Sequence, residues 1–400
     1  MADKVIIAGG GLAGVLTALA LAERRPDVAL CLLESGPALG GNHTWSFFES
    51  DVAGDAAALV APLASHRWPG YTVHFGGFER RLSTPYLSLA SADLHRHAMA
   101  RLGARVRLGA EVAALDGGSV TLADGTRLSA DAVIDARGPA PLAHTTLRFQ
   151  TFVGQEVRLA RPHGLEVPRI MDARVAQIDG YRFLYVLPLS ADTLLIEDTM
   201  YTDAPALDRA ALRRRIADYA AGEGFAVAGV LREEDGTLPL LLQQDFPAMW
   251  RAAAPAGGAV PVGLRAGLFH PVTGYSLPEA ARTAVTLAGL DGPLTSARFG
   301  TAVAALARDA AARHAFGRLL NRLLFLAGRP EDRHRVLARF HTLPQPLIER
   351  FYAGRLTRAD RARILFGKPP VPLLAALRAL PEASAHPPGQ SASPRTSRIE

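Results

Sequence analysis

The sequence predicts an α/β fold with an inserted β-rich domain and a helical C-terminal region. Three observations carry this prediction. An apolar strand at 4–8 leads into glycines and helix-forming sequence at 12–24, and a second apolar strand follows at 29–34. The segment 181–199 reads as two strands joined by a turn. Residues 303–343 are rich in helix formers and Arg.

The charge of the chain is unevenly distributed. The formal net charge is +6, but residues 311–370 carry 13 Lys or Arg and four acidic residues, a net +9, which leaves −3 for the rest. A basic region on a slightly acidic body predicts contact with an anionic surface, either nucleic acid or acidic lipid. The single cysteine, Cys31, excludes an intrachain disulfide.

The N-terminus predicts no targeting segment. Glycines interrupt the first apolar run within ten residues, so the run does not match a signal peptide. The chain also lacks the uninterrupted apolar run of about 18 residues that a transmembrane helix requires. We therefore expect a protein on the cytoplasmic side.

A dinucleotide-binding turn follows the first strand. Gly9, Gly11 and Gly14 form a GxGxxG motif that opens a helix, and Glu34 ends the second strand 20 residues after Gly14. Gly9 permits the tight turn, Gly11 lets the backbone approach a pyrophosphate, and Gly14 allows close packing of helix and strand. The helix N-terminus offers free N–H groups to phosphates, and Glu34 is placed to accept from ribose hydroxyls. These parts in register predict a Rossmann-type domain, for either NAD or FAD.

A second helix start is expected at 276. Ser276 and Glu279 have the spacing of a capping box, with Pro278 in the first turn. Gly274 precedes them and allows close approach of the backbone. A helix N-terminus aimed at a flavin would favour negative charge there. On its own, the motif fits an ordinary capped surface helix equally well.

Five segments carry a family pattern: GGGLAG (9–14), GGNHTWSFF (40–48), FLYVLPLSADTLLIEDTMY (183–201), GLRAGLFHPVTGYSLP (263–278) and FYAGRLTRADRARILFGKPPVP (351–372). They resemble the bacterial lycopene β-cyclase family of FAD-dependent carotenoid cyclases. The resemblance spans nearly the whole chain before the tail that begins at 381. The Ile-Glu-Asp-Thr and Phe-His-Pro-Val-Thr-Gly-Tyr-Ser segments are specific, because a generic flavoprotein does not need them.

The resemblance implies a flavoprotein fold of the glutathione-reductase and hydroxybenzoate-hydroxylase type. Its expected parts are an FAD-binding domain (1–60, 92–148 and 255–310), a β-rich substrate domain (61–91 and 149–254), a helical basic region (311–380) and a disordered tail (381–400). Gly138, Gly274, Tyr275 and Ser276 are expected to complete the flavin pocket. The family implies reduced FAD as the active form, with NADPH or NADH as the electron donor.

The implied reaction is a proton-initiated cyclisation of the acyclic ends of lycopene to β-rings, without net redox change. Strand alternation places Glu197 and Asp198 on opposite faces, so only one of them can face a given cavity. A buried, neutral carboxyl group is a suitable acid for protonating an alkene. The family motif selects Glu197 as the general acid, and Asp198 is expected to anchor the strand through hydrogen bonds. Without the resemblance, an exposed carboxylate in a salt bridge is the simpler interpretation of Glu197.

Aromatic residues are expected to line the substrate pocket. Trp45, Phe183 and Tyr185 could stabilise a carbocation through their π-faces, and His270 is a candidate proton partner. They fit an ordinary core equally well. No clustered metal-ligand spacing occurs, so we predict no metal. The positive charge lacks interleaved aromatics and any known nucleic-acid module, so we predict no nucleic-acid partner.

The substrate of such an enzyme is dissolved in lipid. The Arg-rich region 311–368 and the apolar segment 369–377 therefore predict peripheral attachment to an anionic membrane surface, the cytoplasmic face of the inner membrane. One departure concerns the flavin: many FAD hydroxylases carry an Asp for the ribityl chain where this chain reads Leu-Arg-Ala at 264–266. The main alternative is a redox flavoenzyme on the same fold, an isoprenoid reductase or an aromatic hydroxylase. The sequence does not indicate whether one or both ends of lycopene are cyclised, nor what the oligomeric state is.

Overall fold

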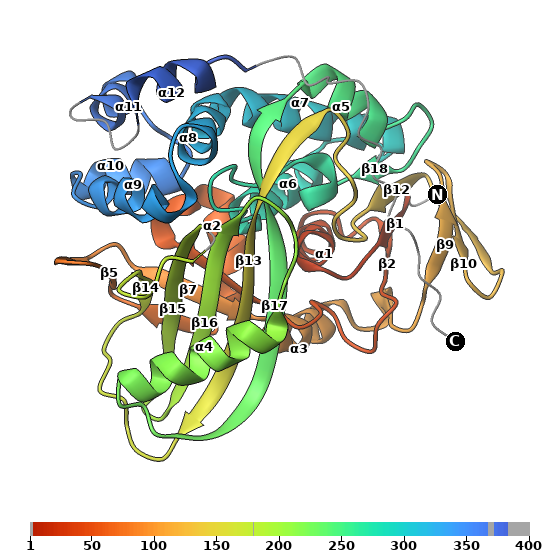
Figure 1. The fold of residues 1–400 in the computed structure, drawn as a ribbon. Coiled ribbons are helices and arrows are strands. Elements are labelled where there is room, and N and C mark those ends of the chain that lie inside the picture. The colour runs from red at the N-terminus through yellow and green to blue at the C-terminus, as the bar shows by residue number, and fades with distance from the viewer. Residues whose placement is uncertain (1–2, 179, 367–371, 383–400) are drawn as a thin grey trace, which may run out of the picture.

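A computed structural model describes residues 3–178, 180–366 and 372–382 (Figure 1). The N-terminal part of the fold is a five-stranded parallel sheet in the order β18-β12-β1-β2-β8. Its strands are β1 (Lys4–Ala8), β2 (Ala29–Leu33), β8 (Val106–Arg107), β12 (Ala132–Asp135) and β18 (Val260–Pro261). The strands predicted at 4–8 and 29–34 are confirmed. Their apolar residues are needed because parallel strands are covered on both faces.

Three helices pack against this sheet in one apolar core: α1 (Leu12–Arg24), α6 (Leu277–Ala288) and α7 (Ser296–Arg313). Helix α3 (Ser91–Leu102) and helix α2 (Gly54–Val60) add to the same core. A small antiparallel sheet of β9 (Val112–Leu115), β10 (Ser119–Leu122) and β11 (Arg127–Ser129) projects from the parallel sheet (Figure 1). The predicted Rossmann-type β-α-β unit is therefore present.

The second part is a seven-stranded sheet in the order β17-β13-β16-β15-β14-β5-β6. Its strands are β5 (Tyr71–Phe75), β6 (Phe78–Leu82), β13 (Thr145–Leu159), β14 (Arg169–Asp172), β15 (Tyr181–Ser190), β16 (Thr193–Thr202) and β17 (Val227–Gln244). All neighbours are antiparallel except β14 and β5. The hairpin predicted within 181–199 is β15–β16, and its turn lies at Ala191 and Asp192 as expected.

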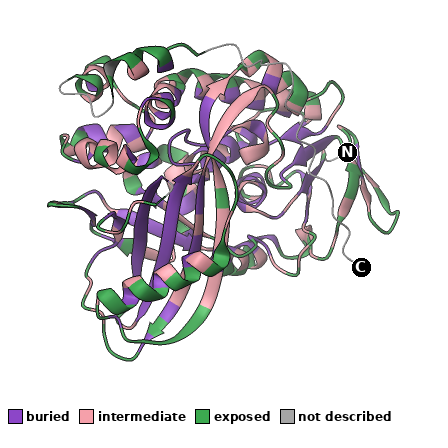
Figure 2. Cartoon of the chain, viewed as in Figure 1, coloured by how far each residue is buried: buried purple, intermediate pink, exposed green. Residues whose placement is uncertain are grey.

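The two faces of this sheet are covered differently. Helix α4 (Arg209–Gly222) lies across one face, which we call the outer face, and exposes its own far side to solvent (Figure 2). The opposite, inner face packs against a small sheet of β3 (Thr44–Phe48), β7 (Tyr86–Ala90) and β4 (His66–Trp68) and against the C-terminal helices. The inner face is therefore enclosed between the two main parts of the fold.

The C-terminal region is helical, as predicted. It contains α8 (Ala315–Leu326), α9 (Arg333–Phe340), α10 (Gln345–Tyr352), α11 (Arg358–Leu365) and α12 (Leu373–Ala379), drawn in blue in Figure 1. Helix α5 (Phe246–Ala253) lies beside α7 and connects the large sheet to β18. The tail predicted to be disordered lies outside the described residues from 383 onward, and the predicted domain boundaries stay a prediction.

Candidate active site

The segments predicted to bind the cofactor meet at one edge of the parallel sheet. Gly9 follows β1, Glu34 follows β2, Gly138 follows β12 and Arg265 follows β18. These four strands are neighbours, and the carboxyl ends of parallel strands share an edge. The structure therefore brings together residues that are more than 200 positions apart in the sequence.

The glycine turn is closely packed at two positions and open at the third. A Cβ on Gly9, whose φ is +106°, would lie 2.3 Å from the carbonyl oxygen of Ala136, and a Cβ on Gly14 would lie 2.0 Å from that of Gly9. A Cβ on Gly11 would meet no atom of the described residues within 4 Å, and Gly11 is the N-cap of α1. Open space beside a helix N-terminus is the arrangement that a pyrophosphate requires.

Two acidic residues frame this edge. The Glu34 carboxylate accepts hydrogen bonds from the backbone N–H groups of Gly10 and Gly36, both at 2.7 Å. Asp135 forms an ion pair with Arg137 (2.9 Å) and a longer one with Arg265 (3.5 Å). Arg265 belongs to the Leu-Arg-Ala segment, where many hydroxylases have an Asp. In this chain the segment instead provides a guanidinium group that pairs with Asp135 at the end of β12.

The start of α6 is as predicted, but its capping box is wrong. Ser276 is the N-cap, yet its side chain makes no capping hydrogen bond with any residue that the structure describes. Glu279 turns away to Arg282 (2.6 Å), Arg313 (2.7 Å) and His314 (3.2 Å). Burial alone would raise the pKa of Glu279, but the His314 hydrogen bond and the two Arg charges hold this pKa well below its usual range. Two guanidinium groups attract the carboxylate more strongly than a backbone amide does.

His270 and Gly274 fix the loop before α6. The His270 ring lies 3.2 Å from the Thr273 hydroxyl and 3.2 Å from the carbonyl oxygen of Phe351. Burial and the neighbouring His314 lower the pKa of His270 to about 3, so the ring is neutral. A Cβ on Gly274, whose φ is +71°, would lie 2.6 Å from the Cβ of Leu238. The loop is thus held tightly against the large sheet.

Glu197 and Asp198 point to opposite faces of the large sheet, as strand alternation predicted. Glu197 lies on the inner face between Tyr185 and Gly154, and is 8% exposed. The Thr199 hydroxyl donates to it at 2.5 Å. Burial, with smaller effects from Glu234 and Asp198, raises the pKa of Glu197 to about 8 despite this hydrogen bond. Glu197 is therefore mostly protonated at neutral pH.

Asp198 has the contrasting environment on the outer face. It is fully buried, and Arg182 donates three hydrogen bonds of 2.7–3.0 Å to its carboxylate. Arg182 itself is anchored by the side chain of Gln177, which contacts both its backbone N–H and its carbonyl group. Asp198 is thus held as one half of a buried ion pair.

Sequence reasoning missed a second inner-face carboxylate, Glu234 on β17. Glu234 is 4% exposed and accepts from Arg232 (2.7 Å) and from the Thr44 hydroxyl (3.1 Å). Gly154 lies between Glu197 and Glu234, and a Cβ there would contact both side chains. The alternation of Arg232 and Glu234 could have indicated that both side chains lie on one face of a strand. Their closeness to Thr44 and Glu197 depends on the folded sheet.

The predicted aromatic residues divide between two cores. Phe183 and Tyr185 lie on the inner face beside Glu197, and the Tyr185 hydroxyl donates to Ser46 at 2.7 Å. Because Thr44 and Ser46 face the large sheet from β3, the intervening Trp45 points away and packs with the core of the parallel sheet. Trp45 is therefore not brought together with Glu197.

This combination of a nucleotide-binding parallel sheet and a large sheet with an enclosed inner face is the fold of the FAD-binding flavoproteins. The structure resembles Klebsiella pneumoniae HpxO complexed with FAD and uric acid (TM-score 0.55, 18% identity, 93% of this chain and 98% of that one). It also resembles a geranylgeranyl bacteriochlorophyll reductase-like protein from Thermoplasma acidophilum (TM-score 0.57, 13% identity, 94% and 95% covered).

Sequence comparison identifies the family. The profile described as "Lycopene cyclase protein" matches residues 4–378, so the chain belongs to the lycopene cyclase family. The chain is 50% identical over 380 residues to a lycopene β-cyclase of Pseudescherichia vulneris, covering 94% of this chain and 96% of that protein. It is 48% identical to the lycopene β-cyclase of a Paracoccus species, covering 96% and 98%.

Proposed function

We propose that the protein is a lycopene β-cyclase in which Glu197 is the general acid. One observation carries this assignment: Glu197 is a buried carboxyl group on the enclosed inner face, and no cation pairs with it among the residues that the structure describes. Its raised pKa keeps the proton available near neutral pH. A neutral carboxyl in a dry environment can protonate an alkene, because the conjugate base is generated beside a new positive charge.

The proposed reaction begins at one acyclic end of lycopene. Glu197 donates its proton to the terminal carbon–carbon double bond, which gives a tertiary carbocation and the Glu197 carboxylate. The neighbouring double bond supplies the electron pair that closes the six-membered ring, and a ring proton is then lost. The product has the mass of the substrate, so the enzyme acts as an isomerase.

The inner face supplies the surroundings that this chemistry needs. Phe183 and Tyr185 present π-electrons on the same face as Glu197, and such rings can stabilise a carbocation. Glu234 is held on the same face by Arg232 and adds a fixed carboxylate near Glu197. Asp198 acts through the strand and not on the substrate, because it faces α4.

The chain is proposed to bind FAD at the carboxyl edge of the parallel sheet. The open space over Gly11 and Gly138 and the uncapped N-terminus of α6 fit a dinucleotide with phosphates on α1 and a flavin toward α6. Glu34 is proposed to bind the ribose, with Gly274, Tyr275 and Ser276 lining the flavin side. Reduced FAD, with NADPH or NADH as its reductant, supplies negative charge near the carbocation.

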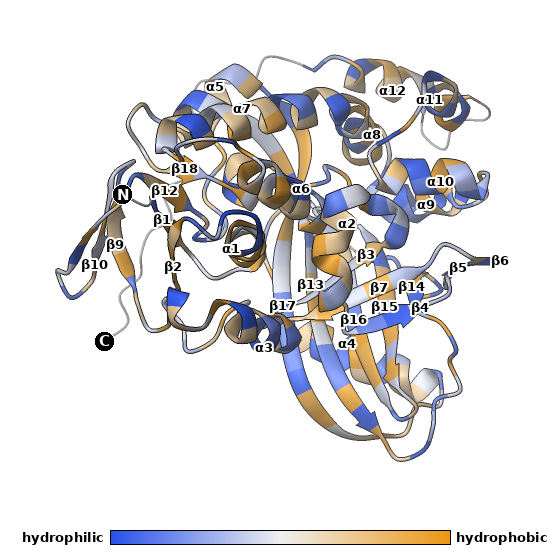
Figure 3. Ribbon diagram, turned by 180° about the vertical axis from the view of Figure 1, so that it is seen from behind, coloured by the Kyte–Doolittle hydropathy of each residue, from blue (hydrophilic) through white to orange (hydrophobic). Residues whose placement is uncertain are grey.

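Peripheral membrane attachment is proposed for the C-terminal helices. Within the described residues, no helix combines the length and apolarity needed to cross a membrane. Helices α11 and α12 lie side by side and carry hydrophobic and hydrophilic residues together (Figure 3). Phe366 is 74% exposed and Leu374 is 72% exposed, and Arg363 and Arg378 stand near them in the sequence. Exposed apolar side chains beside Arg fit an anionic lipid surface. We expect Phe366→Ser/Leu374→Ser to lose sedimentation with anionic liposomes at low salt.

The test of the proposed function is anaerobic incubation of the protein with lycopene in liposomes, FAD and NADPH, followed by chromatography and mass measurement. We expect products of unchanged mass with cyclic ends. Glu197→Gln should reduce the rate by about 10²–10⁴-fold, the usual contribution of a general acid. Glu233→Gln is the matched control, since Glu233 points to the other face and pairs with Arg213. Product of changed mass, or NADPH consumed in step with turnover, would favour a redox flavoenzyme instead.

A further inference from the structure

A small pocket lies between the loop that precedes α6, helix α6 itself and the end of α10. Asp51, His270 and Tyr275 line this pocket, which has room for about 20 Å³, enough for one water molecule. Asp51 is 7% exposed. Its Oδ2 accepts from the backbone N–H of Phe48 at 3.0 Å, whereas its Oδ1 is buried and has no hydrogen-bond partner among the described residues. A buried carboxyl oxygen left unpaired at a water-sized pocket indicates a group that exchanges hydrogen bonds with water.

A chain of phenol groups runs from this pocket toward Glu197. Tyr275 lines the pocket, and its phenol group is close enough to Tyr86 for the two groups to affect each other's pKa. The hydroxyls of Tyr86 and Tyr185 lie 2.9 Å apart. Tyr185 is directly opposite Glu197 in the pairing of β15 and β16, and both Tyr185 and Tyr275 interact electrostatically with Glu197. The three phenol groups thus lie between the pocket of Asp51 and the strand that carries Glu197.

Neutral phenols suit the passage of a proton. Burial raises the pKa values of Tyr86, Tyr185 and Tyr275 well above the ordinary value, so each stays protonated. A hydroxyl can accept one hydrogen bond while it donates another, so a proton added at one end of a row releases another at the far end. No phenolate needs to persist for this transfer.

In the proposed mechanism, Glu197 must regain a proton after each cyclisation. Each cyclisation leaves it as a carboxylate, it is 8% exposed, and the hydrocarbon substrate further excludes water. A group with so little access to solvent regains its proton slowly unless other groups deliver it.

We propose that Asp51, Tyr275, Tyr86 and Tyr185 form a proton relay that restores the proton of Glu197 after each cyclisation. A proton enters from water at Asp51, and each hydroxyl accepts one proton and passes one on. The Tyr185 hydroxyl, which donates to Ser46 in the structure, turns to donate the last proton to the Glu197 carboxylate. Each cycle takes one proton from water through the relay and returns the ring proton to water by a separate route, so the complete cycle neither consumes nor releases protons. This inference rests on the proposed role of Glu197 as general acid.

The test separates the first turnover from later ones in Tyr86→Phe and Asp51→Asn, using rapid mixing with excess substrate. The first ring formed per enzyme should appear at nearly the rate of the unchanged protein, because Glu197 begins protonated. Later rings should form about tenfold more slowly. Tyr181→Phe is the matched control, since its buried hydroxyl lies outside the relay and has no hydrogen-bond partner within the part of the chain that the structure describes. It should slow neither phase.

Two results would overturn the relay. Equal slowing of the first and later turnovers in Tyr86→Phe would give Tyr86 a structural role, and unchanged later turnovers in both variants would mean that Glu197 regains its proton elsewhere. A second measurement does not depend on variants: in D2O the unchanged protein should place one deuterium in every ring, whereas less than one would mean that the ring proton returns directly to Glu197. Loss of the role of Glu197 itself would be distinguishable, because Glu197→Gln would then retain the first turnover.

Discussion

Two neighbouring buried carboxyl groups of β16, Asp198 and Glu197, have opposite surroundings on the two faces of the seven-stranded sheet. On the outer face, Asp198 is paired with Arg182 (2.7 Å), and Asp172 is paired with Arg174. On the inner face, Glu197 has a single hydroxyl donor, Thr199, and its nearest charged neighbours include the carboxylate of Glu234. A buried carboxylate is stable as an ion only with a cation beside it. Burial raises the pKa of both carboxyl groups. The comparison teaches that Arg182 opposes this effect at Asp198, whereas at Glu197 the opposing contact is only the Thr199 hydroxyl, so Glu197 is the carboxyl group suited to keep its proton for chemistry.

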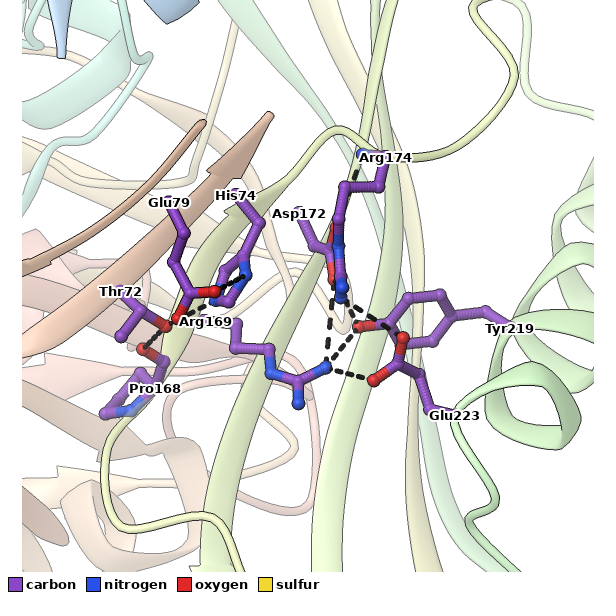
Figure 4. Close-up of polar contacts among 9 residues, drawn as sticks. All are labelled: Thr72, His74, Glu79, Pro168, Arg169, Asp172, Arg174, Tyr219 and Glu223. Atoms are coloured by element: carbon purple, nitrogen blue, oxygen red, sulfur yellow. Dashed lines mark hydrogen bonds and ion pairs between the residues drawn. The ribbon is translucent and has the colours of Figure 1, made fainter. Parts of the chain in front are cut away.

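The Asp172 network gives the outer-face pattern in full (Figure 4). Arg174 and Tyr219 both donate to the Asp172 carboxylate, and Glu223 accepts from Arg169 and Arg174. Burial alone would raise the pKa of Asp172, but these contacts lower it. Tyr219 lies near the end of α4, and Glu223 directly follows this helix. The network therefore connects α4 to β14. These ion pairs on the outer face stabilise the packing of α4 on the sheet.

The largest expected effect comes from making the outer face resemble the inner one. Arg182→Met leaves Asp198 buried without its cation, so we expect a loss of about 3–5 kcal/mol in the free energy of unfolding at neutral pH. Urea denaturation followed by circular dichroism measures it. The double variant Arg182→Met/Asp198→Leu should recover most of this loss. A single variant as stable as the unchanged protein would remove the distinction between the faces.

A smaller effect concerns stability and pH on the inner face. The pKa of Glu197 is about 8 in the fold against an ordinary value of 4.5, so between these pH values the folded state binds more protons than the unfolded state. Stability contributed by the protonated group is therefore lost as pH rises through this window. Glu197→Gln does not titrate, so relative to the unchanged protein it should gain on the order of a few kcal/mol between pH 5 and pH 9. Urea denaturation at pH 5 and pH 9 measures this change. The same difference in unfolding free energy between the two proteins at both pH values would contradict the prediction.

The same titration sets the pH dependence of the reaction. The acid form of Glu197 is required, so the rate should be constant below about pH 8 and fall by about tenfold per pH unit above it. The measurement is the initial rate with saturating FAD and reductant from pH 6 to pH 10. A rate that rises through pH 8 would instead assign Glu197 the role of a base.

The smallest expected effect is the loss of one hydroxyl from the outer-face network. Tyr219 donates to Asp172 at 2.8 Å and accepts from Arg169 at 3.2 Å. Because Arg174 keeps its contact with Asp172, Tyr219→Phe should cost only about 1 kcal/mol of unfolding free energy and leave catalysis unchanged. Thermal unfolding and the cyclisation assay check both parts. A large loss of activity with normal stability would place a functional site on the outer face.

Much of this arrangement could be predicted from the sequence because it depends on local periodicity. The glycines at 9, 11 and 14 and the spacing to Glu34 predicted the nucleotide-binding edge, and alternation along β16 predicted that Glu197 and Asp198 diverge. The hydrophobic run of β1 predicted a strand covered on both faces. Each of these signals lies within a few dozen consecutive residues.

The remaining features depend on contacts between distant segments. Glu279 had the spacing of a capping box, but Arg313 and His314 approach it from α7 and its end. Trp45 lies within a family motif, yet the pairing of β3 turns it away from Glu197. Asp51 reaches its pocket only through the packing of the C-terminal helices. Periodicity cannot indicate such neighbours, because they join segments separated by as many as 300 positions.

The most direct test of the central claim is the protonation state of Glu197 in the folded protein. Infrared difference spectra between the unchanged protein and Glu197→Gln, recorded from pH 6 to pH 10, isolate the carbonyl stretch of this one carboxyl group. The account predicts a protonated carboxyl band at pH 7 that disappears as the pH rises through about 8, and that persists in Glu233→Gln. A carboxylate band for Glu197 already present in full at pH 6 would contradict it.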